Sequence, residues 1–422
     1  MDLILQLFKH KDLRNRILVT FLLLFIFRLV VFIPIPIISS ANLAQLFANN
    51  PFLGLVDIFT GGSLANFSIA MMGVAPYINA AIIMQLMTMA IPSLETLYRE
   101  GDYGRRKVNQ YTRYLTVPLA ILQSYGTVRL IQNSQPDLLP ALSTWQMFAL
   151  VLIATAGTIF LMWLGELITE YGIGNGISLI IFVGIIARLP SALASTLVLA
   201  DVGKIISLIV FGLVAFLTVL FVVYITEGQR KVPISYGGRG ASGRLLLSGT
   251  NYLPIRVNQA GVIPIIFALS LLLFPGLIAS FFAAARSAWL ASAATFVQEL
   301  FQQHTFYAAL YFLLVAFFTY FYTWVVFNPD RVTDHLHKQG GFIPGIRPGP
   351  QTREYLSYLI NRLTLAGAIF LGFIAIMPIV VQAFSGLPSL TIGGTSLLIV
   401  VSVALEVMRQ VQSMLITKRY DV

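Results

Sequence analysis

The stretch PFLGLVDIFTGGSLANFSIAMMGVAPYINAAIIMQLMTMAI, residues 51–91, is apolar enough to enter a membrane but is interrupted in the middle. Its first nine residues are too short to cross a bilayer, because a crossing helix needs about 20 apolar residues. Gly61, Gly62 and Asn66 then interrupt the helix, and residues 69–91 form a full-length candidate span. Backbone that stops at membrane depth is tolerated only where protein or a water-filled cavity surrounds it. The stretch therefore predicts a cavity inside the protein with a short helix in it.

The composition of the whole chain is that of a membrane protein. Of its 422 residues, 57% are hydrophobic and only 10% are charged, whereas about 25% of residues are charged in soluble domains. We expect an all-α polytopic membrane protein with ten transmembrane helices and one short extra helix near 54–63. The first span is too long for a cleavable signal peptide, so we expect it to be retained. The expected spans are 17–38, 69–91, 114–131, 145–168, 177–200, 205–226, 255–283, 305–327, 363–384 and 393–416.

The basic residues cluster in alternate connections between these spans. Lys and Arg are frequent before span 1, between spans 2 and 3, 6 and 7, and 8 and 9, and after span 10. The connections after spans 1, 3 and 9 contain neither residue. Because short cytosolic loops carry the excess of Lys and Arg, we expect both chain termini in the cytosol. The interrupted stretch then enters the membrane from the outside.

The expected spans divide into two halves of five, residues 1–202 and 203–422. An odd number of spans per half reverses the orientation of the second half, which is the arrangement of inverted repeats. A weak internal similarity supports this division, since the second span contains GVAP at 73–76 and the seventh contains GVIP at 261–264. Spans 2 and 7 would then be symmetry mates across a central interface.

The residues that enzymes need are missing from the expected spans. The chain has no cysteine, and all four histidines lie outside the spans, which removes thiolate metal sites and a buried histidine base. As ionisable groups at membrane depth we single out Arg28, Arg129, Glu406 and, in the short segment, Asp57. Such groups are too few for a proton or ion relay. We expect no catalytic residue, no metal and no cofactor. An inverted-repeat transporter of a small solute is the alternative function, and an intramembrane hydrolase is a third.

Three expected spans carry branched aliphatic residues at mid-depth, one helical turn apart where a span has two. These are Val74 and Ile78 in span 2, Ile177 and Ile181 in span 5, and Ile399 in span 10. Toward the cytosolic side, the same spans offer the polar residues Gln85, Asn175 and Glu406. Two interpretations stay open. The aliphatic residues either pack as an ordinary core or form a hydrophobic constriction next to a wet funnel.

Two expected cytosolic loops are longer than a simple connection requires. Residues 227–256 alternate basic and apolar side chains, as an exposed hairpin does, with GGRGASG at the tip. Residues 328–362 contain GGFIPGIRPGPQT, in which glycine and proline would hold Arg347 out on a rigid turn. The positive charge is explained either by membrane topology or by docking of an anionic partner, such as ribosomal RNA or an acidic protein surface.

Ordered motifs along nearly the whole chain resemble the SecY family, the channel subunits of the bacterial protein-translocation complex. The motifs are FIPIP at 32–36, FTGGSLANFS at 59–68, GVAPYINAAIIMQL at 73–86, GIGNGISLIIF at 172–182, VNQAGVIPIIFA at 257–268, GGFIPGIRPG at 340–349 and GGTSLLIVVSVALE at 393–406. The resemblance implies two five-span halves arranged as a clamshell, with a lateral gate between spans 2 and 7 and a plug helix on the external side.

The resemblance also assigns roles to individual residues. It implies a pore ring of Val74, Ile78, Ile177, Ile181, Ile266 and Ile399. It implies a plug at about 52–66 that includes Leu55, Ile58, Phe59, Gly61, Gly62 and Leu64. The implied lateral gate includes Met84, Gln85, Pro264 and Ser270. The implied docking residues for a ribosome or motor are Arg230, Lys231, Arg239, Arg244 and Arg347.

The function that the resemblance implies is a protein-conducting channel. Such a channel moves unfolded secretory polypeptides across the membrane and releases transmembrane segments sideways into the bilayer. The implied partners are the SecE and SecG subunits, the SecA motor ATPase, the ribosome, signal sequences, nascent chains and membrane lipids. The implied location is the bacterial plasma (inner) membrane, with the thylakoid membrane as an alternative. No catalytic residue is needed, because a partner supplies the energy.

Overall fold

The computed structural model describes residues 11–36, 57, 60–134, 142–198, 205–236, 251–282, 287–385 and 394–420. Helices make up most of these residues. In chain order they are α2 (Lys11–Val31), α5 (Ala75–Ala90), α6 (Pro92–Arg99), α7 (Asp102–Ser134), α8 (Thr144–Tyr171), α9 (Gly176–Val198), α10 (Ile205–Glu227), α11 (Ile263–Phe282), α12 (Ala288–Gln302), α13 (His304–Val326), α14 (Pro329–Lys338), α15 (Pro350–Ser385) and α16 (Gly394–Tyr420).

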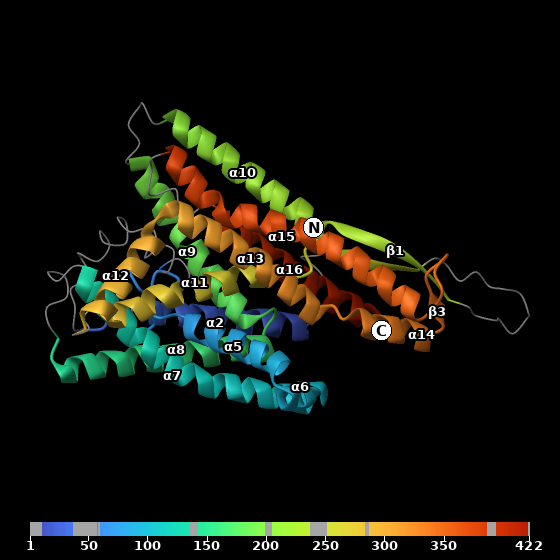
Figure 1. The fold of residues 1–422 in the computed structure, drawn as a ribbon, viewed down its shortest axis with the longest axis horizontal. Coiled ribbons are helices and arrows are strands. Elements are labelled where there is room, and N and C mark those ends of the chain that lie inside the picture. Colours follow the sequence, from blue (N-terminus) through green and yellow to red (C-terminus); the bar gives the residue numbers. More distant parts are fainter. Residues whose placement is uncertain are drawn as a thin grey trace, which may run out of the picture.

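The long helices lie side by side along the length of the molecule (Figure 1). Helices α2 and α5 to α8 pack against one another on one side, and α10, α13, α15 and α16 pack together on the other. Two helices join these groups, because α9 contacts both α8 and α16, and α11 contacts α5, α7 and α13. The small β-sheet lies at one end of the molecule and α12 lies at the opposite end (Figure 1).

Each of the ten apolar stretches expected to cross the membrane overlaps one long helix. Within the described residues, four helical stretches are long and apolar enough to cross a membrane, and the bent pair α5 and α6 would be a fifth. The stretches Gly176–Pro190, Gly212–Glu227 and Ile263–Gly276 are apolar but shorter. The prediction of a helical protein with several membrane spans is confirmed, and the number ten stays a prediction.

The second expected span is shorter than the sequence suggested. Helix α5 begins at Ala75 instead of residue 69 and has 16 residues. The preceding Gly73 has a left-handed φ of 57°, and a Cβ there would lie 3.1 Å from the backbone of Thr60. Pro76 at the first turn then favours the start of a helix. At the other end the helix stops before Pro92, and α6 continues at an angle of 101°.

The backbone between Thr60 and α5 forms a series of turns. Gly61 and Gly62 have φ values of 72° and 84°, which residues with a Cβ rarely adopt. The end of this segment pairs with the chain that leaves α2, because the Ile35 amide donates to Phe67 O at 2.9 Å and the Ile69 amide donates to Ile33 O at 3.1 Å. The backbone of this non-helical segment is therefore hydrogen-bonded to protein, as a position at membrane depth requires.

A three-stranded sheet has the order β2-β1-β3. β1 (Gln229–Tyr236) and β2 (Asn251–Arg256) form the antiparallel hairpin that the alternating sequence predicted. β3 (Gly341–Phe342) pairs with the end of β1 and comes from the second long loop. Val232 and Ile255 are buried under the sheet against Leu356 of α15. The two long loops are thereby joined into one unit that packs on the end of α15.

The contact between the turn segment and α9 gives a prediction on stability. The backbones of Gly61 and Gly184 touch, and a Cβ built on Gly184 would lie 2.6 Å from Gly61 Cα. Gly184→Ala should force these backbones apart and cost about 1–3 kcal/mol of stability, as overpacking does. The variant should show a lower midpoint of thermal unfolding in detergent.

The matched control is Gly212→Ala in α10, where an added Cβ would meet nothing within 4 Å. Alanine is favoured over glycine in a helix by about 1 kcal/mol, so this control should unfold at the same or a slightly higher temperature. Equal midpoints for both variants would contradict the close approach.

Candidate functional site

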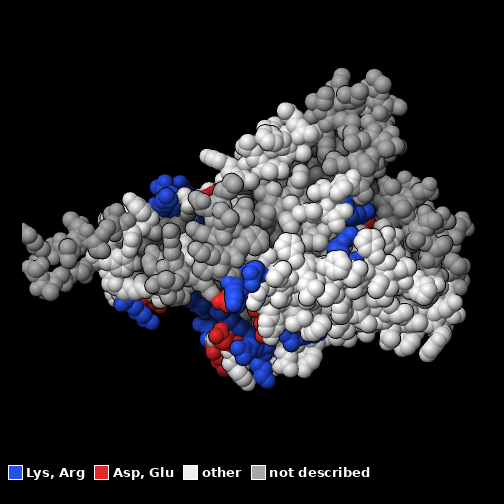
Figure 2. Space-filling view, turned by 180° about the vertical axis from the view of Figure 1, so that it is seen from behind, with Lys and Arg blue, Asp and Glu red and all other residues white. Residues whose placement is uncertain are grey.

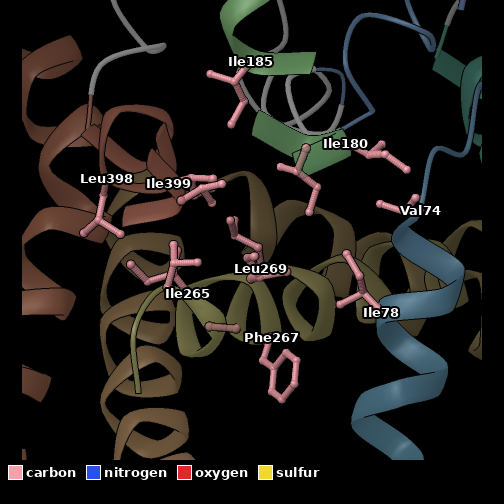
Figure 3. Packing of buried hydrophobic residues seen from close by; sticks show 14 of the residues in the cluster. Val74, Ile78, Ile180, Ile185, Ile265, Phe267, Leu269, Leu398 and Ile399 are labelled. Atoms are coloured by element: carbon pink, nitrogen blue, oxygen red, sulfur yellow. The ribbon is translucent and has the colours of Figure 1, made fainter. Parts of the chain in front are cut away.

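An apolar cluster lies where helices from distant parts of the sequence converge. It receives Val74 from the start of α5, Ile181 from α9, Ile266 from α11 and Ile399 from α16, and all are buried. Figure 3 shows how Val74, Ile78 and Ile399 are arranged around a shared interior with neighbouring aliphatic residues. Because these segments belong to both groups of helices, the cluster joins the two sides of the molecule.

All six residues of the implied pore ring belong to this cluster or pack on it. Ile78 is 8% exposed, Ile399 is fully buried, and Ile177 is a partly buried residue that packs against the others. Sequence reasoning missed several other members that lie beside them, namely Ile180, Ile185, Ile265, Leu269 and Leu398. For the residues on α9 and α11, the signal in the sequence is weak because these two helices are apolar on nearly every face.

The turn segment 60–67 lies against this cluster. Of the implied plug residues, Leu55, Ile58 and Phe59 fall outside the described residues. Gly61 lies against Gly184 of α9 and near Phe27 of α2, which belongs to the cluster. Leu64 is fully buried in a second apolar cluster beside α7 and α8. Residues 60–66 are turns and not helix, so any plug helix must end before Thr60.

Two arginines inside the helices reach the same segment. Arg28 of α2 donates from Nη1 to Gly61 O at 3.2 Å. Arg188 of α9 forms an ion pair with Asp57, whose side chain is completely buried. Arg188 is not among the ionisable residues that the sequence analysis singled out. It lies in the expected span 177–200, and a charged residue inside an apolar span is the signal that would have found it.

A cavity of about 1220 Å³ opens between the two groups of helices. One wall comes from α5, α6 and α7, and the other comes from α13, α14 and α15. Tyr77, Met84, Phe317 and Phe321 supply apolar surface. Charged residues lie at α6, α14 and α15 in the two ion pairs Arg99–Glu95, at 2.5 Å, and Arg353–Asp330, at 2.6 Å. The cavity thus has an apolar part and a charged part.

The implied lateral-gate residues fall into two groups. Met84 and Gln85 of α5 line the cavity. Pro264 and Ser270 of α11 are buried and are not among its lining residues. Helix α11 nevertheless contacts α5 and α7 directly. The helices that carry the implied gate residues, α5 and α11, are therefore in contact, and the cavity lies beside α5.

The basic residues concentrate toward the end of the molecule that carries the sheet and α6 (Figure 2). Arg230 and Lys231 lie exposed on β1, and Arg347 is exposed in a turn between Gly345 and Gly349. Those two glycines have φ values of 82° and 106°, and the Thr352 hydroxyl donates to Arg347 O at 2.9 Å. The turn thus fixes the position of Arg347. Arg239 and Arg244 fall outside the described residues.

At the base of the hairpin, charged residues connect three elements. Arg409 of α16 donates to Glu227 Oε1 at the end of α10 at 2.5 Å and to Thr226 O at 3.1 Å. Burial lowers the pKa of Arg256 at the end of β2, and the nearby positive charge of Arg409 lowers it further. Glu406, two turns after Ile399 on α16, acts in the opposite direction. These interactions link the hairpin to the helix that supplies Ile399 to the apolar cluster.

The comparisons with known proteins agree with this arrangement. The SecY family profile matches residues 68–408. The protein translocase subunit SecY of Streptomyces galbus is 41% identical over 98% of this chain and 97% of its own length. The subunit of the same name from Synechocystis sp. is 42% identical over 99% of this chain and 95% of its own length.

Solved structures of the same fold are more distant in sequence. A protein-conducting channel aligns with a TM-score of 0.65 at 18% identity, over 95% of this chain and 92% of its own. A SecY whose plug domain stabilises the closed state and maintains a membrane seal gives 0.63 at 18% identity and the same coverage. Sec61 in a canine ribosome-channel complex from the endoplasmic reticulum gives 0.62, also at 18% identity and that coverage. The profile match and the near-full-length identity show that this chain belongs to the SecY family.

Proposed function

We propose that this chain is the channel-forming subunit of a protein translocase, which conducts unfolded polypeptides across a membrane and releases apolar segments sideways into the bilayer. The observation that carries the proposal is the convergence of Val74, Ile181, Ile266 and Ile399 from four segments into one apolar cluster. In a member of the SecY family, this cluster is the natural position for a pore that is closed at rest.

The chemistry of the cluster suits a passing polypeptide of any sequence. Aliphatic side chains such as Ile78 and Ile399 carry no fixed charge, so they neither hold an ionic side chain nor repel one. A hydrophobic constriction also excludes water and ions by dewetting when it is narrow. The six pore-ring residues would therefore act as a flexible seal that widens around an extended chain. No bond is made or broken in this step, so the energy must come from a partner.

The lateral exit would lie between α5 and α11. The cavity beside α5 has the apolar surface of Met84 and Phe321 next to the charged pairs Arg99–Glu95 and Arg353–Asp330. An apolar helix of a signal sequence with a polar end matches both parts of this surface. Binding there would separate α5 from α11 and open a path to lipid. The segment 52–66 would act as the plug that covers the pore ring from the external side.

The other proposed contacts follow from the charge distribution. The exposed Arg230, Lys231 and Arg347 would dock a ribosome or the SecA motor at the cytosolic end, with Arg239 and Arg244 contributing to the same surface. SecE and SecG would complete the channel complex in the lipid bilayer. We place the chain in the bacterial plasma membrane, with both termini in the cytosol and residues 1–202 and 203–422 as the two halves. A thylakoid membrane is the alternative location.

Crosslinking tests the path of the polypeptide, and the absence of cysteine from the chain makes it clean. Single cysteines in place of Ile78 and Ile266 should both crosslink to a secretory precursor that is stalled during translocation, because both side chains lie in the central cluster. A cysteine in place of Leu152, which is 58% exposed on α8, should give no crosslink. Failure at both cluster positions in a translocating complex would overturn the channel proposal.

Charge removal tests the docking surface. Arg347→Ala should weaken binding of the ribosome or motor by about 10- to 150-fold, because a charge-assisted hydrogen bond contributes about 1.5–3 kcal/mol. Binding to the complex in membrane vesicles can be measured directly by co-sedimentation or fluorescence titration. Arg129→Ala removes a similar charge from an exposed position in α7 and should leave binding unchanged. An equal loss in both variants would mean that only overall charge matters.

A further inference from the structure

The ion pair between Asp57 and Arg188 joins two parts of the chain that the proposed mechanism must separate. Asp57 lies in the range of the proposed plug, and Arg188 lies in α9. The two residues are 131 positions apart in the sequence. The Asp57 side chain is 0% exposed, whereas that of Arg188 is 32% exposed. The buried partner therefore belongs to the segment that would move.

The Asp57 carboxylate also organises its own segment. Its Oδ1 accepts a hydrogen bond of 2.7 Å from the Ala65 amide, while Oδ2 faces the Arg188 guanidinium. One side chain thus contacts both Ala65 and α9. Close by, Gly62 faces the Arg188 side chain, because a Cβ on Gly62 would lie 3.3 Å from Arg188 Cδ. A Cβ at this position would make a tight contact with the arginine, and the φ of 84° at Gly62 also favours glycine.

Arg188 is also aligned with the apolar cluster. Ile181, Ile185 and Arg188 follow one another at intervals of four and three residues, so they lie on one face of α9. Ile181 and Ile185 are both buried in the cluster. A polypeptide that pushes the Ile181 face of α9 outward would therefore also move the guanidinium away from Asp57. The pore ring and the ion pair are mechanically linked through one helix.

The energetics favour a two-state behaviour of this pair. Burying a charge without its partner is far more costly than burying the pair. The segment therefore either stays in place with the pair formed or leaves as a whole and carries Asp57 into water. Partial displacement, with the carboxylate buried and unpaired, is disfavoured. A latch of this kind keeps a closed channel closed without adding charge to the pore ring itself.

We propose that Asp57 and Arg188 form an ionic latch that holds Asp57 and the turn residues 60–65 against α9 in the idle channel and must separate before a polypeptide passes. Arg188 is then a positioning residue for the plug. The inference rests on the proposed function, since it assumes that this segment closes the pore.

Ion conductance of the idle complex in planar bilayers is the first test. Asp57→Asn and Arg188→Gln should each raise the conductance at least fivefold, because each removes the ion pair that joins Asp57 to α9. The conservative variant Arg188→Lys, which keeps a positive charge opposite Asp57, should hold the conductance within about twofold of the wild-type value. The control is Glu166→Gln, which breaks the exposed pair Arg113–Glu166 and should leave conductance unchanged.

Deleting residues 57–66 separates the latch from the plug assignment. If the deletion raises conductance but Asp57→Asn and Arg188→Gln do not, the latch is overturned and the plug assignment stands. If the deletion also leaves conductance unchanged in a complex that still translocates, the plug assignment itself is wrong.

A reversible crosslink gives a second readout that does not depend on weakening the fold. Asp57→Cys and Arg188→Cys can be bridged in the complete complex by a short cleavable bis-thiol reagent, because the chain has no other cysteine. The bridged complex should translocate a precursor at least tenfold more slowly, and cleavage of the reagent should restore the rate. Translocation at the normal rate with the bridge intact would overturn the proposal that the pair must separate.

Discussion

The backbone of residues 60–74 imposes the constraint on which the rest of this structure depends. Polar backbone groups that meet lipid cost several kcal/mol each, so a non-helical segment at membrane depth needs protein or a water-filled cavity around it. The Phe67 carbonyl accepts from the Ile35 amide, the Ser63 hydroxyl donates to Thr60 O and Ala70 O, and Arg28 donates to Gly61 O. The segment is therefore enclosed by α2 and the chain after it, by α7 and α8, and by α9.

The long helices were predictable because hydropathy and helix length are linked by the thickness of the bilayer. The start of α5 was not predictable in this way. Residues 69–74 are as apolar as the helix that follows, and they are kept out of it by Gly73, which must approach Thr60 closely. That contact depends on how the turn segment folds back on itself, so the hydropathy of the sequence does not reveal it. The bend at Ile91 has a local cause in Pro92 and was the easier feature to anticipate.

In the candidate site, too, some residues could be identified from local sequence spacing, and others depend on contacts that only the folded chain makes. Spacing alone singled out Val74, Ile181 and Ile399, because polar residues on the same helices define a face. Ile266 came only from the family resemblance, since α11 is apolar on nearly all sides and its periodicity carries no signal. Arg188 is visible as a charge in an apolar helix, but its role depends on Asp57, which folding brings beside it from 131 residues away.

In the proposed channel, the placement of charge relative to the apolar cluster would let one seal accept many polypeptides. A charge on the pore ring would bind some sequences and repel others, and it would hold water in the constriction. In this chain the charged residues lie two helical turns away from the aliphatic residues of the cluster. Arg188 follows Ile181 on α9, and Glu406 follows Ile399 on α16. The proposed ring would then remain indifferent to sequence, while ion pairs on the same helices would determine how readily the closed arrangement is released. Separating these two tasks would allow the strength of closure to change without changing what the pore accepts.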